Sequence, residues 1–269
     1  MIRGAVLGKP IAHSLSPLLH SRAYQELGVG ATYEKIEVSS GDLVSFLNGL
    51  DDSWNAFSLT MPLKEEVLDV ADHISELALR IKSANTLHKV EGEWFATSTD
   101  VDGFRNSLLM HEINFSSHVV IIGAGATARA AAAVCDGTAA HISVINRSTA
   151  RTADMQKAVV ESPISFVDWS NCSIINNADL VINTTPGNAA DILISDLSAN
   201  IATTYFESLY NPWPTQLAEQ WSARGGQVID GLDLLIHQAL VQIEIFSGQK
   251  FDKQSMYSLL RTVGVSALK

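Results

Sequence analysis

A lysine and an aspartate each stand directly after a short strand-like segment in the first hundred residues. Lys64 follows the turn Thr-Met-Pro at 60–62, and Asp100 follows Ser-Thr at 98–99. Reducing a ketone by hydride transfer creates alkoxide character on the carbonyl oxygen, which needs a proton donor, and the reverse oxidation needs a base. An ammonium group held by a carboxylate can stabilise that oxygen and exchange its proton. Lys64 and Asp100 are therefore candidate catalytic residues for carbonyl chemistry, against the alternative that Lys64 is an ordinary surface lysine.

Hydroxyl and amide side chains occupy the other strand ends of this region. Ser14 and Ser16 lie in the loop PIAHSLSP after the first apolar segment, Thr60 ends the segment before Lys64, and Asn85 begins the segment NTLHKV. In α/β sheets, ligands bind beyond the carboxyl ends of the strands. These side chains predict a pocket for a small polyhydroxylated molecule at one edge of a sheet.

A glycine-rich turn stands in the middle of the chain, at Gly123-x-Gly125-x-x-Ala128. It follows the apolar segment VVII and opens an alanine-rich helical segment. In a dinucleotide-binding fold, the first glycine permits a tight turn, the second lets the backbone approach a pyrophosphate, and a small third residue lets the helix pack closely on the strand. The helix N-terminus then holds the phosphates. The motif predicts a dinucleotide site, although glycines at this spacing also occur in purely structural turns.

The segment NRSTAR, residues 146–151, follows the next predicted strand and indicates which dinucleotide binds. Sites that prefer NAD usually place Asp or Glu at this strand end, where a carboxylate would repel a 2′-phosphate. Arg147 and Arg151 stand there instead, and guanidinium groups bind phosphate oxygens in fork geometry. NADP is therefore the predicted cofactor, the alternative being two solvated arginines. The loop at 183–186, after a third strand, either faces the nicotinamide or is an ordinary turn.

Short apolar segments alternate with helical patterns from end to end of the chain, which is typical of βα units and largely parallel sheets. In the first series, Ser16 as N-cap and Pro17 at N1 predict the start of the first helix. A hairpin is predicted over 84–98, with its turn at 91–93. A second series begins at His118, and two helices close the chain. We expect an α/β fold of two domains that meet at a ligand-binding cleft.

The composition limits the classes of partner. The 269 residues carry a formal net charge of −11 and a pI near 5.1, which argue against a nucleic-acid or anionic-membrane surface. Cys135 and Cys172 have neither metal-ligand spacing nor a disulfide framework, as expected in a reducing cytoplasm. No run of residues is long and apolar enough for a membrane span or a signal peptide. We therefore expect a cytoplasmic monomer or homodimer that binds small molecules and no metal.

Nine motifs resemble the shikimate dehydrogenase family and occur in that family's order: PIAHSLSP, LTMPLK, SANTL, STDVDGF, GAGATARA, NRSTAR, NTTPG, YNPWPT and GLDLLIHQAL. They cover nearly the whole chain. The resemblance implies a substrate domain formed by residues 1–101 and 236–269, and a doubly wound, Rossmann-type NADP-binding domain formed by residues 102–235. The implied reaction is the reversible, NADPH-dependent reduction of 3-dehydroshikimate to shikimate, a step toward chorismate and the aromatic amino acids.

The resemblance also assigns residues to the two ligands. Lys64 matches the family's catalytic lysine, with Asp100 as its partner, and Tyr210 matches a tyrosine near the substrate and the nicotinamide. Without the resemblance, Gln238 would be interpreted as a polar residue on an amphipathic helix. The family's contacts to the substrate fall on Ser14, Ser16, Thr60, Asn85, Asp100 and Gln238. Its cofactor contacts fall on Gly123, Ala124, Gly125, Ala126, Thr127, Asn146, Arg147, Ser148, Arg151, Thr184, Leu209 and Gly231.

Four positions depart from the family pattern. Ser58 and Ser98 stand where the family usually has Asn, Glu207 where Asp is usual, and Ala126 where the turn usually has another Gly. The two serines bring fewer donors to the pocket, so quinate is an alternative substrate, since related enzymes oxidise quinate as well. A second alternative is a regulatory module that senses NADP and has lost catalysis, although the presence of the candidate catalytic pair argues against it.

Overall fold

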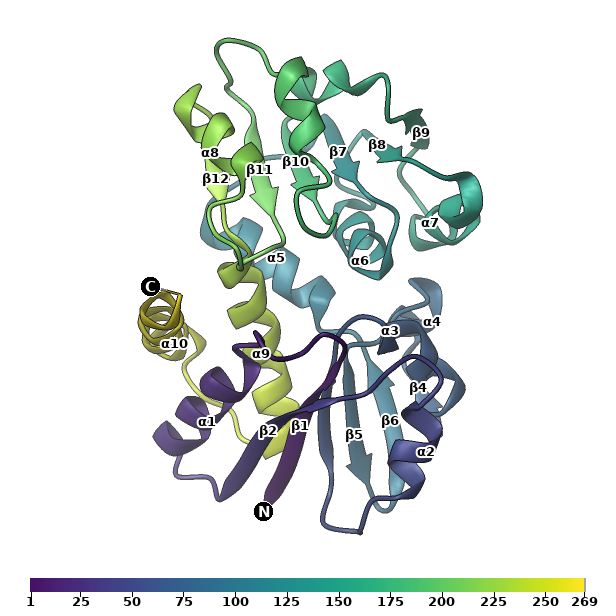
Figure 1. The fold of residues 1–269 in the computed structure, drawn as a ribbon, viewed down its shortest axis with the longest axis vertical. Coiled ribbons are helices and arrows are strands. Elements are labelled where there is room, and N and C mark those ends of the chain that lie inside the picture. Colours follow the sequence, from purple (N-terminus) through teal and green to yellow (C-terminus); the bar gives the residue numbers. More distant parts are fainter. Residues whose placement is uncertain (269) are drawn as a thin grey trace. The chain divides into compact units, whose positions relative to one another are not determined.

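The computed structural model describes residues 1–268, which form two compact units (Figure 1). Unit 1 contains Met1–Gly103 and the described residues from Leu235 onward, and unit 2 contains Phe104–Leu234. Each unit is an α/β structure with a six-stranded sheet. The domain boundaries expected from the sequence, after residues 101 and 235, fall within the same two helices as the observed ones, α5 (Asp100–Met110) and α9 (Gly231–Ser247).

The sheet of unit 1 is mixed, because one hairpin is inserted among parallel strands. β1 pairs in parallel with both β2 and β3, whereas β5 is antiparallel to both β3 and β6, and β4 is parallel to β6. In sheet order the strands are β2 (Ala31–Glu37), β1 (Ile2–Gly8), β3 (Ala56–Leu59), β5 (Thr86–Val90), β6 (Glu93–Thr97) and β4 (His73–Ile74).

The reversed direction of β5 brings the polar strand ends of unit 1 together. Ser58 of β3 pairs with Thr86, the first residue of β5, and Thr86 pairs with Thr97, the last residue of β6. Three strand ends are therefore neighbours at one edge of the sheet: the end of β3, the start of β5 and the end of β6. β1 is parallel to β3, so its carboxyl end lies at the same edge. Four segments adjoin this edge: residues 9–16, 60–64, 83–85 and 98–100.

The hairpin predicted over residues 84–98 is confirmed as β5 and β6. Val90 pairs with Glu93, so only Glu91 and Gly92 form the turn. Their φ angles are +52° and +94°, as the tight two-residue turns of twisted hairpins require.

Helices in unit 1 connect the strands and cover the sheet. α1 (Ser16–Glu26) lies alongside α10 (Lys253–Ala267) (Figure 1). The remaining helical segments are α2 (Leu43–Asn48), α3 (Leu63–Glu66), η1 (Val67–Asp69) and α4 (Glu76–Arg80).

The start of α1 differs from the predicted cap. Pro17 lies in the first turn as expected, but Ser16 is already the first helical residue, and Leu15 at the N-cap position makes no side-chain cap bond. The hydroxyl of Ser14 instead accepts a hydrogen bond from the Ser16 backbone N–H at 3.3 Å. A hydroxyl outside the helix therefore satisfies one of the free N–H groups at its start.

A stacked pair of rings, from Tyr33 of β2 and His20 of α1, lies in the interior of unit 1. The ring centroids are 4.1 Å apart, with 6° between the planes. Gly4 of β1 makes room for Tyr33, because a Cβ atom on Gly4 would lie 2.9 Å from Tyr33 Cδ2 and 2.5 Å from Ala56 O. Burial lowers the pKa of His20 to about 3, against a hydrogen bond that the ring donates to Gln242 and that raises it, so the ring is neutral near pH 7.

The described strands of unit 2 form a wholly parallel sheet. From β7 the chain proceeds to one side through β8 and β9, and then to the other side through β10, β11 and β12. This is the doubly wound order, and its direction changes between β7 and β10, where such folds bind dinucleotides. The strands are β7 (His118–Ile122), β8 (His141–Asn146), β9 (Ile164–Asp168), β10 (Leu180–Asn183), β11 (Thr204–Glu207) and β12 (Val228–Ile229).

α6 (Ala126–Cys135) starts directly at the glycine-rich turn, and its residues from Ala128 onward are all buried. Alanine has the highest helix propensity, and its small side chain lets the helix lie close to the sheet. The other helical segments of unit 2 are η2 (Thr149–Arg151), α7 (Thr152–Ala158), η3 (Cys172–Asn177), η4 (Asp191–Asp196) and α8 (Gln216–Ala223). Within residues 1–268, none of the helices combines the length and the apolar character needed to cross a membrane.

Candidate active site and cofactor-binding loops

Lys64 and Asp100 form an ion pair at the shared sheet edge of unit 1. Lys64 lies in the single turn of α3, which follows β3, and Asp100 opens α5 after β6. Lys64 Nζ donates to Asp100 Oδ2 at 2.7 Å, and the side chains are 14% and 3% exposed. The ammonium group is the more accessible partner, so the pair can offer a positioned proton donor to a ligand.

Asn85 holds the other carboxylate oxygen of Asp100. Its Nδ2 donates to Asp100 Oδ1 at 2.9 Å and also to Gln238 Oε1 of α9. Its Oδ1 accepts from the Thr99 backbone N–H at 2.8 Å and from the hydroxyls of Thr86 and Thr99. Because a backbone N–H can only donate, the orientation of the Asn85 amide is determined. Asp100 is thus fixed through both of its oxygens.

The remaining predicted substrate residues of unit 1 lie on segments at the same edge. The Thr60 side chain lies against Gly8, at the end of β1. Ser14 and Ser16 are buried, and the loop that carries them follows β1. In the part of the chain that the structure describes, the hydroxyls of Thr60 and Ser16 make no hydrogen bond, so both retain their hydrogen-bonding capacity. The structure therefore brings hydroxyl, amide, ammonium and carboxylate groups to one edge, as the strand ends predicted.

Gln242, which the sequence patterns did not single out, lies one turn after Gln238 on α9. It is 2% exposed, and its Nε2 donates to Asn85 O at 3.1 Å and to Thr86 Oγ1 at 2.9 Å. The available signal was the i, i+4 spacing of two glutamines on one predicted helix, which places them on the same face.

The two serines that depart from the family pattern are both buried. Ser58 Oγ is hydrogen-bonded to Gln242 Oε1 and to the Tyr33 hydroxyl, so both of its bonds are made to buried side chains inside unit 1. Ser98 is 2% exposed, and its Oγ has no hydrogen-bond partner within residues 1–268. The expectation that Ser58 changes the donors of an open pocket is therefore revised: its hydroxyl is already engaged inside the sheet.

The glycine-rich turn of unit 2 has the backbone geometry of a phosphate-binding turn. Gly123 has a φ angle of +108°, and a Cβ atom there would lie 2.6 Å from Thr184 Oγ1. Glycine takes this conformation without steric cost. Gly125 is the N-cap of α6, so the first N–H groups of the helix are free of the helix's own carbonyls. Three further predicted cofactor contacts lie in this turn or at the start of α6, and they are half-buried: Ala124, Ala126 and Thr127.

The segment 146–151 turns sharply at the end of β8. Asn146 Nδ2 donates to the Ser148 carbonyl at 2.7 Å, and the Ser148 hydroxyl accepts from the Ala150 N–H at 3.2 Å. These local bonds use the predicted polar residues to shape the loop, which leaves its two arginines at the surface.

Arg147 and Arg151 project from this loop without carboxylate partners. Arg147 Cζ lies 5.6 Å from the centre of the Trp169 ring. Arg151 Nη1 lies beside the glycine-rich turn, 3.2 Å from where a Cβ on Gly125 would be. Neither arginine forms an ion pair within residues 1–268. Two uncompensated guanidinium groups at the end of β8, one of them next to the turn, fit the 2′-phosphate of NADP.

Glu207, at the end of β11, is a buried carboxylate with four donors. It accepts from Tyr205 Oη at 2.7 Å, Asn183 Nδ2 at 3.0 Å, Thr215 Oγ1 at 3.1 Å and the Leu209 N–H at 3.1 Å. Burial raises the pKa of Glu207, and these hydrogen bonds oppose the rise. The carboxylate thereby ties the ends of β10 and β11 to the segments that follow them.

Three of the predicted cofactor residues, Thr184, Leu209 and Gly231, lie on the segments that follow β10 and β11 or pack against them. Thr184 Oγ1 donates to Ile122 O at 2.9 Å, which places it next to the glycine-rich turn. Gly231 packs against the backbone of Leu209, where a Cβ would lie 2.5 Å from the Leu209 carbonyl carbon. Tyr210 is half-buried in unit 2, whereas the other predicted substrate contacts belong to unit 1.

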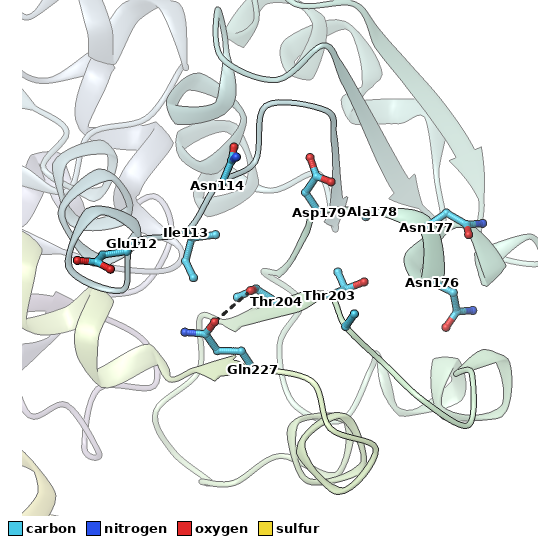
Figure 2. A pocket seen from close by; sticks show the side chains of 11 residues that line it. Glu112, Ile113, Asn114, Asn176, Asn177, Ala178, Asp179, Thr203, Thr204 and Gln227 are labelled. Carbon is cyan, nitrogen blue, oxygen red and sulfur yellow. Dashed lines mark hydrogen bonds between the residues drawn. The ribbon is translucent and has the colours of Figure 1, made fainter.

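A separate hollow of about 500 Å³ in unit 2 contains none of the predicted site residues (Figure 2). Asp179 and Thr204 line it at the starts of β10 and β11, and Gln227 lies before β12, where its Oε1 accepts from Thr204 Oγ1 at 3.5 Å. The hollow is thus at the amino-terminal edge of the sheet, opposite the glycine-rich turn, whereas dinucleotides bind beyond the carboxyl edge. Among the described residues, no group of three or more His, Cys, Asp or Glu side chains could hold a metal ion.

Two family models match the chain. Residues 6–87 match the shikimate dehydrogenase substrate binding domain, and residues 109–204 match the shikimate / quinate 5-dehydrogenase model. A curated relative from Desulfitobacterium hafniense, a shikimate dehydrogenase (NADP(+)), is 31% identical over 262 residues, which cover 95% of this chain and 96% of the relative.

Solved structures resemble the chain over nearly its whole length. The shikimate dehydrogenase of Mycobacterium tuberculosis has a TM-score of 0.87 and 33% identity, covering 97% of this chain and 100% of that one. A shikimate 5-dehydrogenase from Thermus thermophilus, solved with NADP(H) and shikimate, has a TM-score of 0.84 and 28% identity, covering 98% and 100%.

Proposed function

The chain belongs to the shikimate dehydrogenase family, and we propose that it catalyses the reversible, NADPH-dependent reduction of 3-dehydroshikimate to shikimate. The observation that carries this proposal is the Lys64–Asp100 pair, at 2.7 Å, on the same sheet edge as the amides of Asn85 and Gln238. An enzyme that reduces a carbonyl on a polyhydroxylated ring needs this combination of one proton donor and several oriented hydrogen-bonding groups.

The residues of unit 1 divide between binding and proton transfer. The hydroxyls of Ser14 and Ser16 can donate to the substrate carboxylate, and the hydroxyl of Thr60 can bind a hydroxyl of the substrate ring. Because Gln238 Oε1 accepts from Asn85, the Gln238 amide presents its N–H groups to the remaining surroundings. These groups bind and orient the ring so that its carbonyl oxygen meets Lys64 Nζ.

Lys64 then supplies the proton of the reaction. NADPH, when bound, supplies the hydride that reaches the carbonyl carbon. As charge develops on the carbonyl oxygen, the Lys64 ammonium stabilises it and transfers a proton to it, which leaves a neutral amine. In the direction of oxidation the neutral amine takes the hydroxyl proton. Asp100 keeps Nζ in place through both steps and is itself held by Asn85.

The residues of unit 2 fit NADP. The N-terminus of α6 and the turn at Gly123 and Gly125 provide N–H groups for the pyrophosphate, and Arg147 and Arg151 provide charge for the 2′-phosphate. Thr184, Leu209 and Gly231 are assigned to the nicotinamide end.

The substrate and the cofactor can be identified in one experiment. Initial rates are measured with shikimate and with quinate, each with NADP and with NAD. We expect shikimate with NADP to have the highest kcat/KM, with NAD at least about tenfold lower because it lacks the charged group that the arginines bind. A higher kcat/KM for quinate would make quinate the proposed substrate, and quinate is also named in one of the two matching family models. If 3-dehydroshikimate oxidises neither NADPH nor NADH, the chain is better explained as a non-catalytic NADP-sensing module.

We further propose that the protein works in a reducing cytoplasm as a monomer or homodimer. Cys135 and Cys172 are both free and buried, and burial raises the pKa of their thiols to about 12 and about 11. Such thiols are unreactive packing groups. Size-exclusion chromatography with light scattering measures the oligomeric state.

A further inference from the structure

A network of buried polar side chains lies next to the catalytic pair in unit 1. We call it the Gln242 network, and its members come from five different elements. All are buried, and each has a hydrogen-bond partner. Buried polar groups are costly unless their hydrogen bonds are made, so the positions of these side chains depend on one another. The members are His20 (α1), Tyr33 (β2), Ser58 (β3), Thr86 (β5) and Gln242 (α9).

The orientation of the Gln242 amide follows from its neighbours. One end of the amide faces the carbonyl oxygen of Asn85 at 3.1 Å, and a carbonyl can only accept, so that end is Nε2. Oε1 therefore faces Ser58 Oγ at 2.7 Å and His20 Nε2 at 3.2 Å. Both of these groups must donate to it. His20 then carries its proton on Nε2, and its Nδ1 accepts from Tyr24 Oη at 3.1 Å.

The hydroxyl protons of the network are assigned in the same way. Ser58 uses its proton for Gln242, so the Tyr33 hydroxyl donates to Ser58 Oγ. Thr86 Oγ1 accepts from Gln242 Nε2 at 2.9 Å and donates to Asn85 Oδ1 at 2.8 Å. Ser58 and Thr86 therefore each accept one of these bonds and donate another, and Tyr33 donates one.

The donors on the Asn85 side of Gln242 all point toward the candidate active site. Gln242 donates to Thr86, Thr86 donates to Asn85, and Asn85 donates to Asp100 Oδ1 at 2.9 Å. Asp100 Oδ2 accepts from Lys64. Gln242 also donates to the Asn85 carbonyl, so it fixes both the backbone and the side chain of the residue that orients Asp100.

We propose that Gln242 is a positioning residue for the Lys64–Asp100 pair and acts through Thr86 and Asn85. With 2% of its surface exposed and both ends of its amide engaged, Gln242 has no group left for a ligand. The inference rests on the proposed function, since its effect is on the same reduction.

Gln242→Met tests the proposal because methionine keeps the length of the side chain and removes the amide. We expect kcat for 3-dehydroshikimate reduction to fall roughly 10- to 100-fold, since small displacements of catalytic groups cost factors of this size. The Kd of NADPH, whose contacts are in unit 2, should change by less than about twofold. Gln254→Met, at an exposed position of α10 in the same unit, is the matched control and should keep the wild-type kcat.

Two further variants separate positioning from a general loss of structure. Thr86→Val keeps the shape of the side chain but interrupts the route from Gln242 to Asn85, so it should lower kcat even if Gln242→Met does not fold. If Gln242 acts through Asn85, adding Gln242→Met to Asn85→Ala should lower kcat no further than Asn85→Ala alone. A purely structural role predicts that the two losses multiply.

The outcomes distinguish this inference from the proposed function. A wild-type protein that does not reduce 3-dehydroshikimate overturns the proposed function and this inference with it. An active wild type whose Gln242→Met or Thr86→Val variant keeps its kcat overturns only the role of Gln242, as does a multiplicative loss in the double variant.

Discussion

Lys64 is placed by its partner more than by its own helix. α3 has only four residues, and the field of one helical turn is weak compared with that of a long helix. The carboxylate of Asp100, at 2.7 Å, is the nearest charge and is itself oriented by Asn85. The position of the ammonium group therefore depends on residues of α3 and α5 and of the segment that precedes β5.

Removing the ammonium group tests the role of Lys64 directly. Lys64→Ala should lower kcat about 10²- to 10⁴-fold, because it removes the group that donates the proton in the proposed mechanism. The Kd of NADPH, measured by fluorescence quenching, should stay close to that of the wild type. Lys89→Ala removes a lysine of the same unit that pairs with the exposed Asp52 at 3.5 Å, and it should keep full activity. If the Lys64→Ala enzyme keeps its activity, Lys64 is not the catalytic acid and base and is better explained as an ordinary lysine.

The types of the site residues could be predicted from the sequence, but their hydrogen bonds could not. Lys64, Asn85 and Asp100 stand at strand ends, and strand ends can be read from local apolar patterns. The roles of Ser58 and Gln242 depend on which way an amide and two hydroxyls point. Those directions are set by contacts between residues 184 positions apart in the sequence, which no local pattern contains.

The loops at the carboxyl edge of the sheet in unit 2 determine the proposed cofactor preference. The loop after β8 carries both arginines, and its own polar side chains bond to its backbone rather than to the guanidinium groups. The arginines are thereby left for a ligand, although a positive charge close to the start of a helix is unfavourable unless an anion binds nearby.

Substituting one arginine of this loop should change the preference between cofactors. Arg151→Ala should raise the KM for NADPH about tenfold or more, which corresponds to the loss of one or two charge-assisted hydrogen bonds, and should leave the KM for NADH nearly unchanged. Lys157→Ala removes a positive charge from α7, the next helix, and controls for general electrostatics. Equal effects on NADPH and NADH would show that Arg151 does not read the 2′-phosphate.

Local patterns predicted most elements but missed those that depend on distant partners. The hairpin of β5 and β6 follows from its turn residues and from alternation. β9 was not predicted, because it is a half-buried edge strand whose pairing with β8 is its main support. The cap of α1 was assigned to Ser16 because a serine before a proline is a common start signal, whereas the structure uses Ser14.

The folded molecule as a whole should be sensitive to acid through His20. The unfolded chain binds a proton at this residue below about pH 6.5, whereas the buried ring binds it only below about pH 3. Between these values the unfolded state holds more protons, so the free energy of unfolding falls as the pH falls.

We expect His20 to contribute a loss of about 1.4 kcal/mol per pH unit between about pH 6 and 4. Urea unfolding at several pH values measures the slope, and His20→Phe, which retains a ring beside Tyr33, should reduce it by this amount. His13→Asn, at an exposed position, is the control and should keep the wild-type slope. An unchanged slope in His20→Phe would mean that the ring is protonated in the folded state.

The division of the chain into two α/β units was visible in the sequence because each half has its own βα series. The order of strands within each sheet is harder to predict from the sequence. The parallel order of unit 2 follows from a recurrent fold with a known motif, whereas the insertion of β5 between β3 and β6 in unit 1 is a matter of long-range pairing. It is this insertion that brings Asn85 and Asp100 to the edge where Lys64 lies.

The contact between Gly4 and Tyr33 limits which residues relatives can carry at these positions. Tyr33 needs the missing side chain at position 4, and its hydroxyl occupies the space next to Ser58 that a larger amide would fill. Positions 33 and 58 are therefore expected to covary among relatives, so that chains with Asn at position 58 lack a tyrosine at 33. Position 4 is expected to stay glycine in either case, because a Cβ there would also lie 2.5 Å from the Ala56 carbonyl oxygen. Replacing Ser58 by the larger Asn is therefore expected to require a smaller residue at position 33 as well, because the amide and the tyrosine hydroxyl would compete for the same space.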